Sequence, residues 1–542
     1  MAARSMAAFR RLSDLARLWR TVRDLKPRMI GYRLIRFFYR PTLSNIPESA
    51  AAVACSWPLT SFSPVPVADR YDPEFQTFET LNLPSVSVHD AVWTEGLHGL
   101  LWNYHLNSLT WLEAFSTPDA RVDTLLERRA ILPLHRHADA PYPQSLRIFS
   151  LIRYLLRTEI RSSVLLQKLW TDYQQLRRVP EYHLDGNHLL ENFLAAYSAA
   201  LFFGDSAQLP LLEQRLLEAL HQQFLQDGGH YERSIHYTAQ LTASMLKTLG
   251  IAQLTGNALS SLEAQLTQLI SRALGWMEAL QFSDGSFPAF GDSHSHLLPS
   301  LNLLLQSAAE LNVFPQVQPV SDSGYYRFRN AAFDCIINAG SPAPAHQPGH
   351  AHADATSFCL HVEGRPLIVD TGISTYERNQ QRLSERQSAA HNVLQPPGED
   401  SAEVWAAFRM GRKPQVTLLE RTSRRLVVQH DGFRKHCLLV SRVFDFEERC
   451  FTLTERVSGT AAGMESRLHF HPDVIVTLVN ETTFQAEGLG LQIRFSGFKK
   501  VSQFTYDWCG GFNLRRPATA LVAVLQQPEA SIFFQTLSFS TP

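Results

Sequence analysis

Apolar residues recur at helical spacing through much of the first 320 residues. Runs with a repeat of three to four residues lie at 145–178, 187–203, 209–226, 236–255, 259–281 and 297–312. Short turns that contain Gly or Pro separate these runs, and helices joined by such turns pack as antiparallel hairpins. The pattern therefore predicts an all-α domain over residues 93–320.

The pattern changes after Phe314, where the segment PQVQPVSDSG breaks the helical period. Short stretches rich in β-branched and aromatic residues follow, among them FDCIINAG, PLIVD, CLLVSRVFDF and CFTLTERVSG. Runs of strands after runs of helices indicate two layers that are built separately. We therefore expect a β-sandwich over residues 321–542.

The first 92 residues form a separate region, with a basic helical segment followed by a segment rich in proline. Positions 1–40 hold eleven Arg or Lys residues and only two acidic ones, Asp14 and Asp24. Apolar residues recur among them at helical spacing, at Phe9, Leu12, Leu15, Trp19 and Val22. A basic amphipathic helix of this kind either docks on a membrane surface or packs on its own domain. Seven prolines then interrupt residues 41–92, which predicts a long irregular connection.

Composition excludes several classes of protein. The chain has 542 residues, of which 45% are hydrophobic and 19% charged, so it carries enough apolar surface to fold as a globule. Its net charge of -1 provides no overall basic field, and we expect no nucleic-acid partner. Six scattered cysteines without a CxxC pair indicate neither a disulfide framework nor a thiolate zinc site.

No stretch reaches the roughly 18 apolar residues of a membrane span, and the N-terminus lacks the apolar run and cleavage site of a signal peptide. We therefore expect a cytoplasmic protein. Such a protein could also contact the inner membrane peripherally through residues 1–40. The alternative is a periplasmic location. The sequence leaves the oligomeric state open.

Candidate metal ligands follow the change to strands. In GHAHADATSF, His350 and His352 are two residues apart, so on a strand they project to the same face, and Asp354 lies close by. Asp370 ends the apolar strand PLIVD, and His391 lies in AAHNVL. Two imidazoles and one carboxylate, from His352, His391 and Asp370, form a ligand set that suits zinc. The alternative is a strand that merely carries two polar side chains.

The helical half holds a second cluster of polar residues. GNHLLEN places Asn187 and His188 at the start of an apolar helix, with Glu191 one turn later. The segment DGGHYERSIHYTAQ adds His230, Tyr231, Glu232, Arg233, His236 and Tyr237. Taken singly, these residues are ordinary helix caps and core histidines. Their position at the starts of two neighbouring hairpins suggests that they line one end of a helical ring.

A third segment, DGSFPAFGDSHSH, contains Asp284, Asp292, His294 and His296. Turn chemistry explains Asp-Gly and Gly-Asp by default, and no strand pattern supports this second HxH as a metal site. HExxH, GxSxG, Walker A and GxGxxG motifs are absent from the sequence.

These segments, in this order, resemble the heparinase II/III-like polysaccharide lyases, which include alginate lyases of the same architecture. The resemblance rests on LKPRMIGYRLIRFFYR, LWNYHLNSL, GNHLLENF, QDGGHYERSIHY, FSDGSFPAFGDS, GHAHADATSFCLHVEGRPLIVDTGISTY and RQSAAHNVL. It covers most of the chain. It implies an incomplete (α/α) toroid followed by a C-terminal antiparallel β-sandwich, which agrees with the hydrophobic pattern.

The resemblance also implies roles for single residues. Asn187 and His350 would neutralise a uronate carboxylate, His188 would be a base, and Tyr237 the general acid and base. The family's structural zinc, one ion per chain, would be bound by His352, Asp370 and His391. The predicted substrate contacts are Glu191, Arg233, His236, Tyr376 and Arg386.

The implied reaction is β-elimination on a uronic-acid-containing polysaccharide, and the implied partner is that acidic polymer. The C5 proton is weakly acidic while the neighbouring carboxylate is negative, so groups that neutralise the carboxylate are needed. The near-zero net charge favours a carboxylated exopolysaccharide over a highly sulfated chain. A glycoside hydrolase and a non-catalytic glycan-binding protein of exopolysaccharide biosynthesis are the alternatives.

Overall fold

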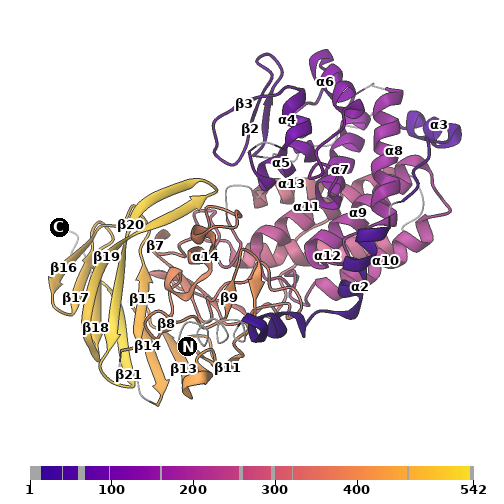
Figure 1. The fold of residues 1–542 in the computed structure, drawn as a ribbon. Coiled ribbons are helices and arrows are strands. Elements are labelled where there is room, and N and C mark those ends of the chain that lie inside the picture. The colour runs from indigo at the N-terminus through magenta and orange to yellow at the C-terminus, as the bar shows by residue number, and fades with distance from the viewer. Residues whose placement is uncertain are drawn as a thin grey trace.

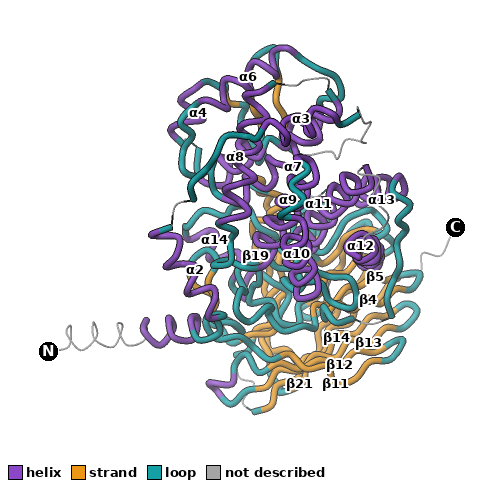
Figure 2. Tube along the Cα trace, turned by 90° about the vertical axis from the view of Figure 1, so that its right-hand side faces the viewer, coloured by secondary structure: helices purple, strands orange, loops and turns teal. Residues whose placement is uncertain are grey.

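The computed structural model describes residues 14–39, 41–58, 68–96, 98–158, 162–254, 261–294, 299–319, 321–459 and 463–537. Helices make up its N-terminal part and antiparallel strands its C-terminal part, and the two parts lie side by side (Figure 1). Figure 2 shows the same division from another side, with the strands gathered below the helices. The predicted fold class, a helical toroid followed by an antiparallel β-sandwich, is confirmed.

The helical domain is organised around α9 (Gly186–Phe203). The sequence of α9 is apolar on every side, and α7, α8, α10 and α11 pack against it. A helix that is hydrophobic all round is stable only when it is buried in this way. The other helices are α4 (Asp90–Glu95), α5 (Leu100–Ser108), α6 (Ala120–Ile131), α7 (Pro141–Arg157), α8 (Ser163–Arg178), α10 (Leu209–Gln223), α11 (Ile235–Leu254), α12 (Ser261–Leu280) and α13 (Leu301–Glu310).

Three sheets form the C-terminal part. One has the order β4 (Tyr325–Arg329), β5 (Phe333–Asn338), β6 (Phe358–Val362), β7 (Arg365–Ile368). A second has the order β19 (Phe498–Gly511), β20 (Leu514–Leu525), β15 (Glu465–His469), β8 (Leu394–Gln395). The third has the order β11 (Val416–Arg421), β12 (Arg425–His430), β13 (Leu439–Phe446), β14 (Cys450–Ser458), β21 (Glu529–Thr536), β18 (Leu491–Ser496), β17 (Thr483–Ala486), β16 (Val476–Asn480). Their inward residues share one hydrophobic core.

Shorter elements complete this part of the chain. They are α14 (Gln380–Arg386) and a two-stranded ribbon of β9 (Val404–Trp405) and β10 (Arg409–Met410). The turn between β9 and β10 carries Phe408, whose ring contacts that of His350 with centroids 6.3 Å apart.

The N-terminal region is more regular than predicted. Residues 14–22 are helical, and α2 (Pro27–Phe38) and α3 (Glu48–Ser56) follow. A small antiparallel sheet of β1 (Arg70–Asp72), β2 (Thr77–Glu79) and β3 (Val86–Ser87) precedes α4. The prediction of an irregular connection over residues 41–92 was therefore wrong for these elements.

The prolines explain this difference. Pro47 precedes the first residue of α3, while Pro73 and Pro84 lie between the short strands. Proline is tolerated at a helix start and in turns, so it marks the ends of short elements as readily as it marks irregular chain. The predicted helix begins in residues 1–13, which lie outside the described ranges.

A buried ion pair joins the two parts of the molecule. Both guanidinium Nη atoms of Arg382 on α14 donate to the Asp292 carboxylate, each at 2.6 Å. Gly291, with φ +56°, lets the backbone before Asp292 approach the carbonyl of His350, which a Cβ would meet at 2.6 Å. The Asp292 amide then donates to that carbonyl at 2.9 Å. These contacts fix the position of the segment around His350 on the helical domain.

None of the helices in the described residues is long and apolar enough to span a bilayer.

Candidate active site

The turn before α9 places Asn187. Asp185 and Gly186 both have positive φ values, 61° and 60°. A Cβ on Gly186 would lie 2.0 Å from Oε1 of Glu232, so only glycine fits there. The Asn187 amide donates to that Glu232 oxygen at 2.8 Å. This turn therefore fixes the first residues of α9 against the segment before α11.

His188 is paired with a buried carboxylate. Its Nδ1 lies 3.1 Å from Oε2 of Glu181, and its ring stacks on Tyr142 with centroids 4.3 Å apart. Burial lowers the pKa of His188, but the charge and hydrogen bond of Glu181, together with the charges of Glu232 and Glu191, outweigh burial and raise the pKa above its usual value. The side chain keeps 25% of its surface exposed, so the ring can reach a ligand.

His350 and Tyr237 come together from different domains. Nδ1 of His350 is hydrogen-bonded to Oε2 of Glu232, so Nε2 is the ring nitrogen that can face a ligand. The His350 ring stacks on the Tyr237 ring, with centroids 3.9 Å apart and planes at 17°. The Tyr237 hydroxyl lies 2.9 Å from that of Tyr376, which follows β7. Five predicted site residues are thus connected, because Asn187 and His350 share Glu232, His188 follows Asn187 on α9, and Tyr237 contacts both His350 and Tyr376.

Burial determines the protonation of Tyr237. It raises the pKa of the Tyr237 hydroxyl well above 10, and the neighbouring Tyr376 and Asp292 raise it further. Burial and the charge of Glu191 raise the pKa of the Tyr142 hydroxyl in the same way. Tyr237 is therefore neutral at ordinary pH and carries a proton that it can donate.

Comparison with known proteins supports the resemblance seen in the sequence. Residues 144–321 match the family model described as heparinase II/III N-terminus, and residues 315–532 match the one described as heparinase II/III-like, C-terminal. The chain belongs to the heparinase II/III-like family.

One curated relative of this heparinase II/III-like chain is a heparin-sulfate lyase of Bacteroides stercoris. It is 24% identical over 245 residues, which are 39% of the chain and 36% of the relative. The match thus spans about a third of that relative's length.

Solved structures match over almost the whole chain. A crystal structure of heparinase III has a TM-score of 0.63 at 15% identity and covers 95% of the chain and 89% of that protein. Heparan sulfate lyase HepC from Pedobacter heparinus has a TM-score of 0.53 at 16% identity, over 94% of the chain and 88% of that protein. At these identities the likeness establishes the shared fold.

Two other predicted substrate contacts, His236 and Glu191, are buried. His236 is buried against His294, with ring centroids 4.2 Å apart. Glu191 is buried one turn into α9 and accepts a hydrogen bond from Ser244. Both side chains are buried, and their predicted contact with substrate stays a prediction.

The two predicted arginines, Arg233 and Arg386, donate hydrogen bonds to backbone carbonyl groups. Arg233 donates to the carbonyls of Ser323 and Ser341, at 2.5 and 2.8 Å, and so connects the two domains. Arg386 is fully buried and donates to the carbonyl of Ala351 at 2.9 Å. It also donates to Ala406 at 3.0 Å, so it holds the His350 segment beside the turn that carries Phe408. In these positions both arginines orient the site.

The predicted zinc ligands are neighbours. His391 Nδ1 lies 2.8 Å from Asp370 Oδ2, and the ring centroids of His352 and His391 are 5.3 Å apart. Nε2 of His352 is bonded to Asp292 at 2.8 Å, whereas Nδ1 of His352 and Nε2 of His391 are buried without a hydrogen-bond partner. Within the described ranges, no group of three or more His, Cys, Asp or Glu side chains is arranged to hold a metal ion. Zinc therefore stays a prediction, to which the two buried nitrogens lend chemical support.

Several residues of the site were not predicted. Glu181, Tyr142 and Arg382 belonged to no candidate motif, and Asp292 was explained by its turn. Glu232 was named only as one member of the polar cluster in HYERSIHY, five residues before Tyr237, and no role was predicted for it. No local pattern could pair Arg382 with Asp292, since 90 residues separate them.

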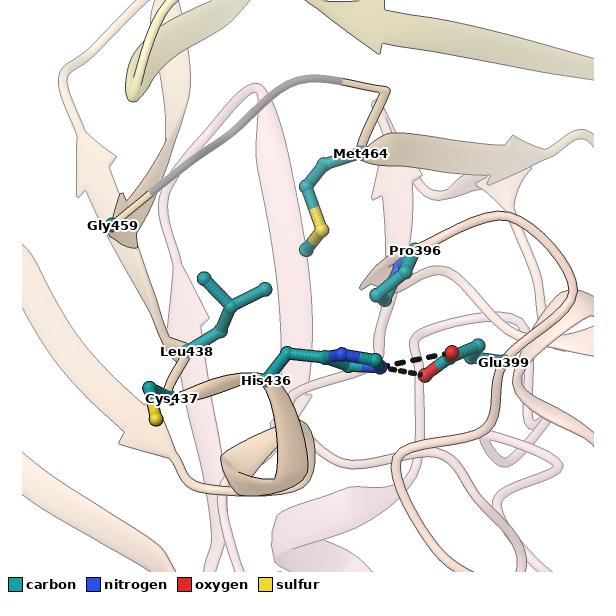
Figure 3. Close-up of a pocket in the computed structure, with 7 residues that line it drawn as sticks. All are labelled: Pro396, Glu399, His436, Cys437, Leu438, Gly459 and Met464. Atoms are coloured by element: carbon teal, nitrogen blue, oxygen red, sulfur yellow. Dashed lines mark hydrogen bonds and ion pairs between the residues drawn. The ribbon is translucent and has the colours of Figure 1, made fainter.

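A pocket in the C-terminal domain is separate from this site (Figure 3). It has a volume of about 480 Å³ and is lined by Pro396, Glu399, His436, Cys437, Leu438, Gly459 and Met464. Its one charged pair joins Nε2 of His436 to the Glu399 carboxylate at 2.8 and 2.9 Å. It shares no residue with the histidine and tyrosine cluster.

Glu191 generates a prediction about stability. Burial raises the pKa of its carboxyl to about 7, against the opposing effects of Ser244 and Lys247. A raised carboxyl pKa stabilises the folded state below pH 4.5, and this contribution is lost as the pH rises through 7. Glu191→Gln removes the ionisation, so the variant should gain stability relative to the parent between pH 5 and 8.5, by up to about 3 kcal/mol.

Thermal unfolding midpoints of both proteins across that pH range measure this effect. Glu218→Gln, an exposed change on α10, serves as the control and should show a constant difference from the parent. A pH-independent difference for Glu191→Gln as well would contradict the role of the buried carboxyl.

Proposed function

We propose that this protein is a polysaccharide lyase that cleaves a uronic-acid-containing polysaccharide by β-elimination. The observation that carries the proposal is the joining of Asn187, His188, Tyr237 and His350, from both domains, around one place. The relatives named as heparin-sulfate lyase and heparinase III support the same class of reaction.

The carboxylate of the substrate needs neutralising before its C5 proton can leave. Asn187 lies at the N-terminal end of α9, where the helix dipole favours a negative group. His350, oriented by Glu232 through Nδ1, presents Nε2. Together they would stabilise the charge that develops as the proton is removed, in the manner of an oxyanion hole.

Two proton transfers complete the reaction. Because its pKa is raised by burial, Tyr237 is suited to donate its proton to the oxygen of the departing sugar. His188 in its neutral form can accept the C5 proton, and Glu181 stabilises the imidazolium that results. Tyr237 acting as both acid and base is the alternative assignment, which variants of the two residues distinguish.

A glycoside hydrolase is the weaker assignment. It needs an acid and a second carboxylate about 5 to 9.5 Å apart and open to the substrate. Glu181 and Glu232 are both buried and both paired with histidines. Formation of the unsaturated uronate, which absorbs in the ultraviolet, separates a lyase from a hydrolase and from a binding protein.

We propose a carboxylated polyuronate as the substrate, because the near-zero net charge of the protein favours such a polymer over a highly sulfated one. A panel of purified polyuronates, with heparan sulfate and heparin included, tests this by ultraviolet absorbance. Turnover of the sulfated chains alone would overturn the choice of substrate while leaving the lyase chemistry in place.

Tyr237→Phe should abolish most of the elimination activity. The ring and its stacking on His350 remain, while the proton that general acid catalysis requires is lost, so we expect a fall in kcat of about 10²- to 10⁴-fold. Tyr376→Phe removes only the partner of that hydroxyl and should cost roughly tenfold. Asn187→Ala should cost about 10²- to 10³-fold by loss of carboxylate stabilisation.

All three variants should keep the parent's thermal unfolding midpoint within a few degrees. Each immobilised variant should still bind the oligosaccharide that the immobilised parent binds. Near-normal elimination by Tyr237→Phe on every polymer that the parent cleaves would refute the assigned role.

The pairing of His188 with Glu181 predicts a pH dependence. As a base, His188 must be neutral, so activity should rise with pH as the pH passes its raised pKa. Glu181→Gln removes the charge that raises this pKa, and the acidic limb of the kcat/KM profile should move to lower pH. Glu399→Gln, which alters a remote Glu–His pair, should leave the profile in place. An unmoved acidic limb in Glu181→Gln would remove His188 from the mechanism.

We also propose one structural zinc ion, bound by His352, Asp370 and His391. When bound, the ion would fix the segment that carries His350. Metal analysis of the purified protein should find about one equivalent of zinc per chain, as a closed structural site requires. A chelator should lower the unfolding midpoint of the parent and leave that of His391→Ala unchanged. Metal-free protein of full stability would contradict this.

A further inference from the structure

The helix over residues 14–22 faces the protein with its polar side. Arg20 donates to both oxygens of Glu403, at 2.6 and 2.8 Å, and Trp405 donates to the Thr21 hydroxyl at 3.1 Å. Just beyond this helix, Lys413 is paired with Asp24 at 2.7 Å. Ion pairs and hydrogen bonds, rather than apolar packing, therefore attach this helix to the β9–β10 region.

The opposite side of the same helix is apolar and exposed. Leu15, Leu18 and Trp19 lie on one helix face and keep 62%, 48% and 66% of their surface exposed. A surface helix of a globular protein normally turns its apolar stripe toward the core. Here the stripe points outward, which inverts the usual arrangement.

Helix α2 extends this apolar surface. Met29 is buried and Tyr32 packs on Tyr182 with ring centroids 4.4 Å apart, so one side of α2 is attached to the helical domain. The outer residues keep between 43% and 87% of their surface exposed, and they are Ile30, Leu34, Phe37 and Phe38. In Figure 2, α2 and the helix before it lie on the same side of the molecule.

The charge around this surface is positive. Residues 14–39 carry seven Arg or Lys against two acidic residues, and one of these, Asp24, is already paired with Lys413. Arg23 and Arg28 keep 50% and 39% of their side chains exposed, although each lies 3.5 Å from a carboxylate oxygen, of Asp24 and Asp185 respectively. A face that combines apolar and aromatic residues with arginines is typical of helices that lie in a membrane interface.

We propose that residues 14–39 form a docking surface for an anionic lipid bilayer, on which the two helices lie flat. The apolar side chains would enter the boundary between headgroups and acyl chains, and the arginines would contact the negative headgroups.

Charge argues against the other occupants. In a two-fold dimer this face would meet a copy of itself, which would bring two strongly basic surfaces together. The sequence before residue 14 contains Arg4, Arg10 and Arg11 and no acidic residue, so its net charge has the same positive sign.

The surface is rigidly connected to the candidate site. Lys26, which precedes α2, is paired with Asp185 at 2.8 Å, and Arg33 donates to the carbonyl of His183 at 3.3 Å. Both acceptors belong to the turn that places Asn187. Docking would therefore hold the site at a fixed height above the bilayer.

Sedimentation of the full-length protein with lipid vesicles tests the proposal without any polysaccharide. The parent should bind vesicles that contain about 30% phosphatidylglycerol, bind those of pure phosphatidylcholine much more weakly, and lose affinity as salt is raised. The double variants Leu18→Ser/Trp19→Ser and Phe37→Ser/Phe38→Ser should each lower the apparent affinity by about tenfold or more.

Ile131→Ser/Phe75→Ser is the matched control, because these two residues are 74% and 70% exposed on other elements. It should bind as the parent does, and all variants should keep the parent's unfolding midpoint. Failure of the parent to bind anionic vesicles at low salt would overturn the proposal, as would equal loss of binding in the control. Light scattering that shows a parent dimer dissociated by the helix variants would instead identify the surface as a contact between copies.

Discussion

The arrangement of the molecule depends on one buried carboxylate. Asp292 accepts two hydrogen bonds from Arg382 and one from His352, and these donors come from the domain opposite to its own. Burial would raise the pKa of the Asp292 carboxyl, but the charge of Arg382 holds it far below its usual value. Removing either partner would leave a buried charge uncompensated, which costs several kcal/mol in proteins generally, about 3 to 5. The relative position of the two domains is therefore fixed by charge as well as by packing.

The same principle orients the reactive groups. Each histidine of the cluster has one ring nitrogen occupied by a buried glutamate, His188 by Glu181 and His350 by Glu232. In both pairs the carboxylate selects the nitrogen that remains for a ligand, and at His188 it also contributes to the raised pKa of the ring. Glu232 also accepts the Asn187 amide, so one side chain positions groups on α9 and on the strand-rich domain. The two buried glutamates thus hold the side chains of the cluster in position.

The sequence revealed what depends on local pattern. The periodicity of α9 and α11, the alternation in the strands and the spacing of His350 and His352 required no knowledge of distant contacts. The paired partners of the site residues could not be found in this way, because Arg382 and Asp292, or Glu232 and His350, lie about 90 to 120 residues apart. Tertiary contacts also changed what two predicted residues do. Arg233 and Arg386 are of the type that binds anionic sugars, yet both donate hydrogen bonds to backbone carbonyls of the fold.

The hydrogen bond between the hydroxyls of Tyr237 and Tyr376 joins two domains, and so does the stacking of Tyr237 on His350. Both contacts exist only while the domains are closed against each other. An opening wide enough to admit a polymer from the side would separate these groups and leave the molecule able to hold a chain but unable to react with it. Such an opening would also have to break the ion pair of Asp292 with Arg382. Entry of the polymer and cleavage of its bonds would therefore belong to different conformations, and domain movement would contribute to the time between cuts.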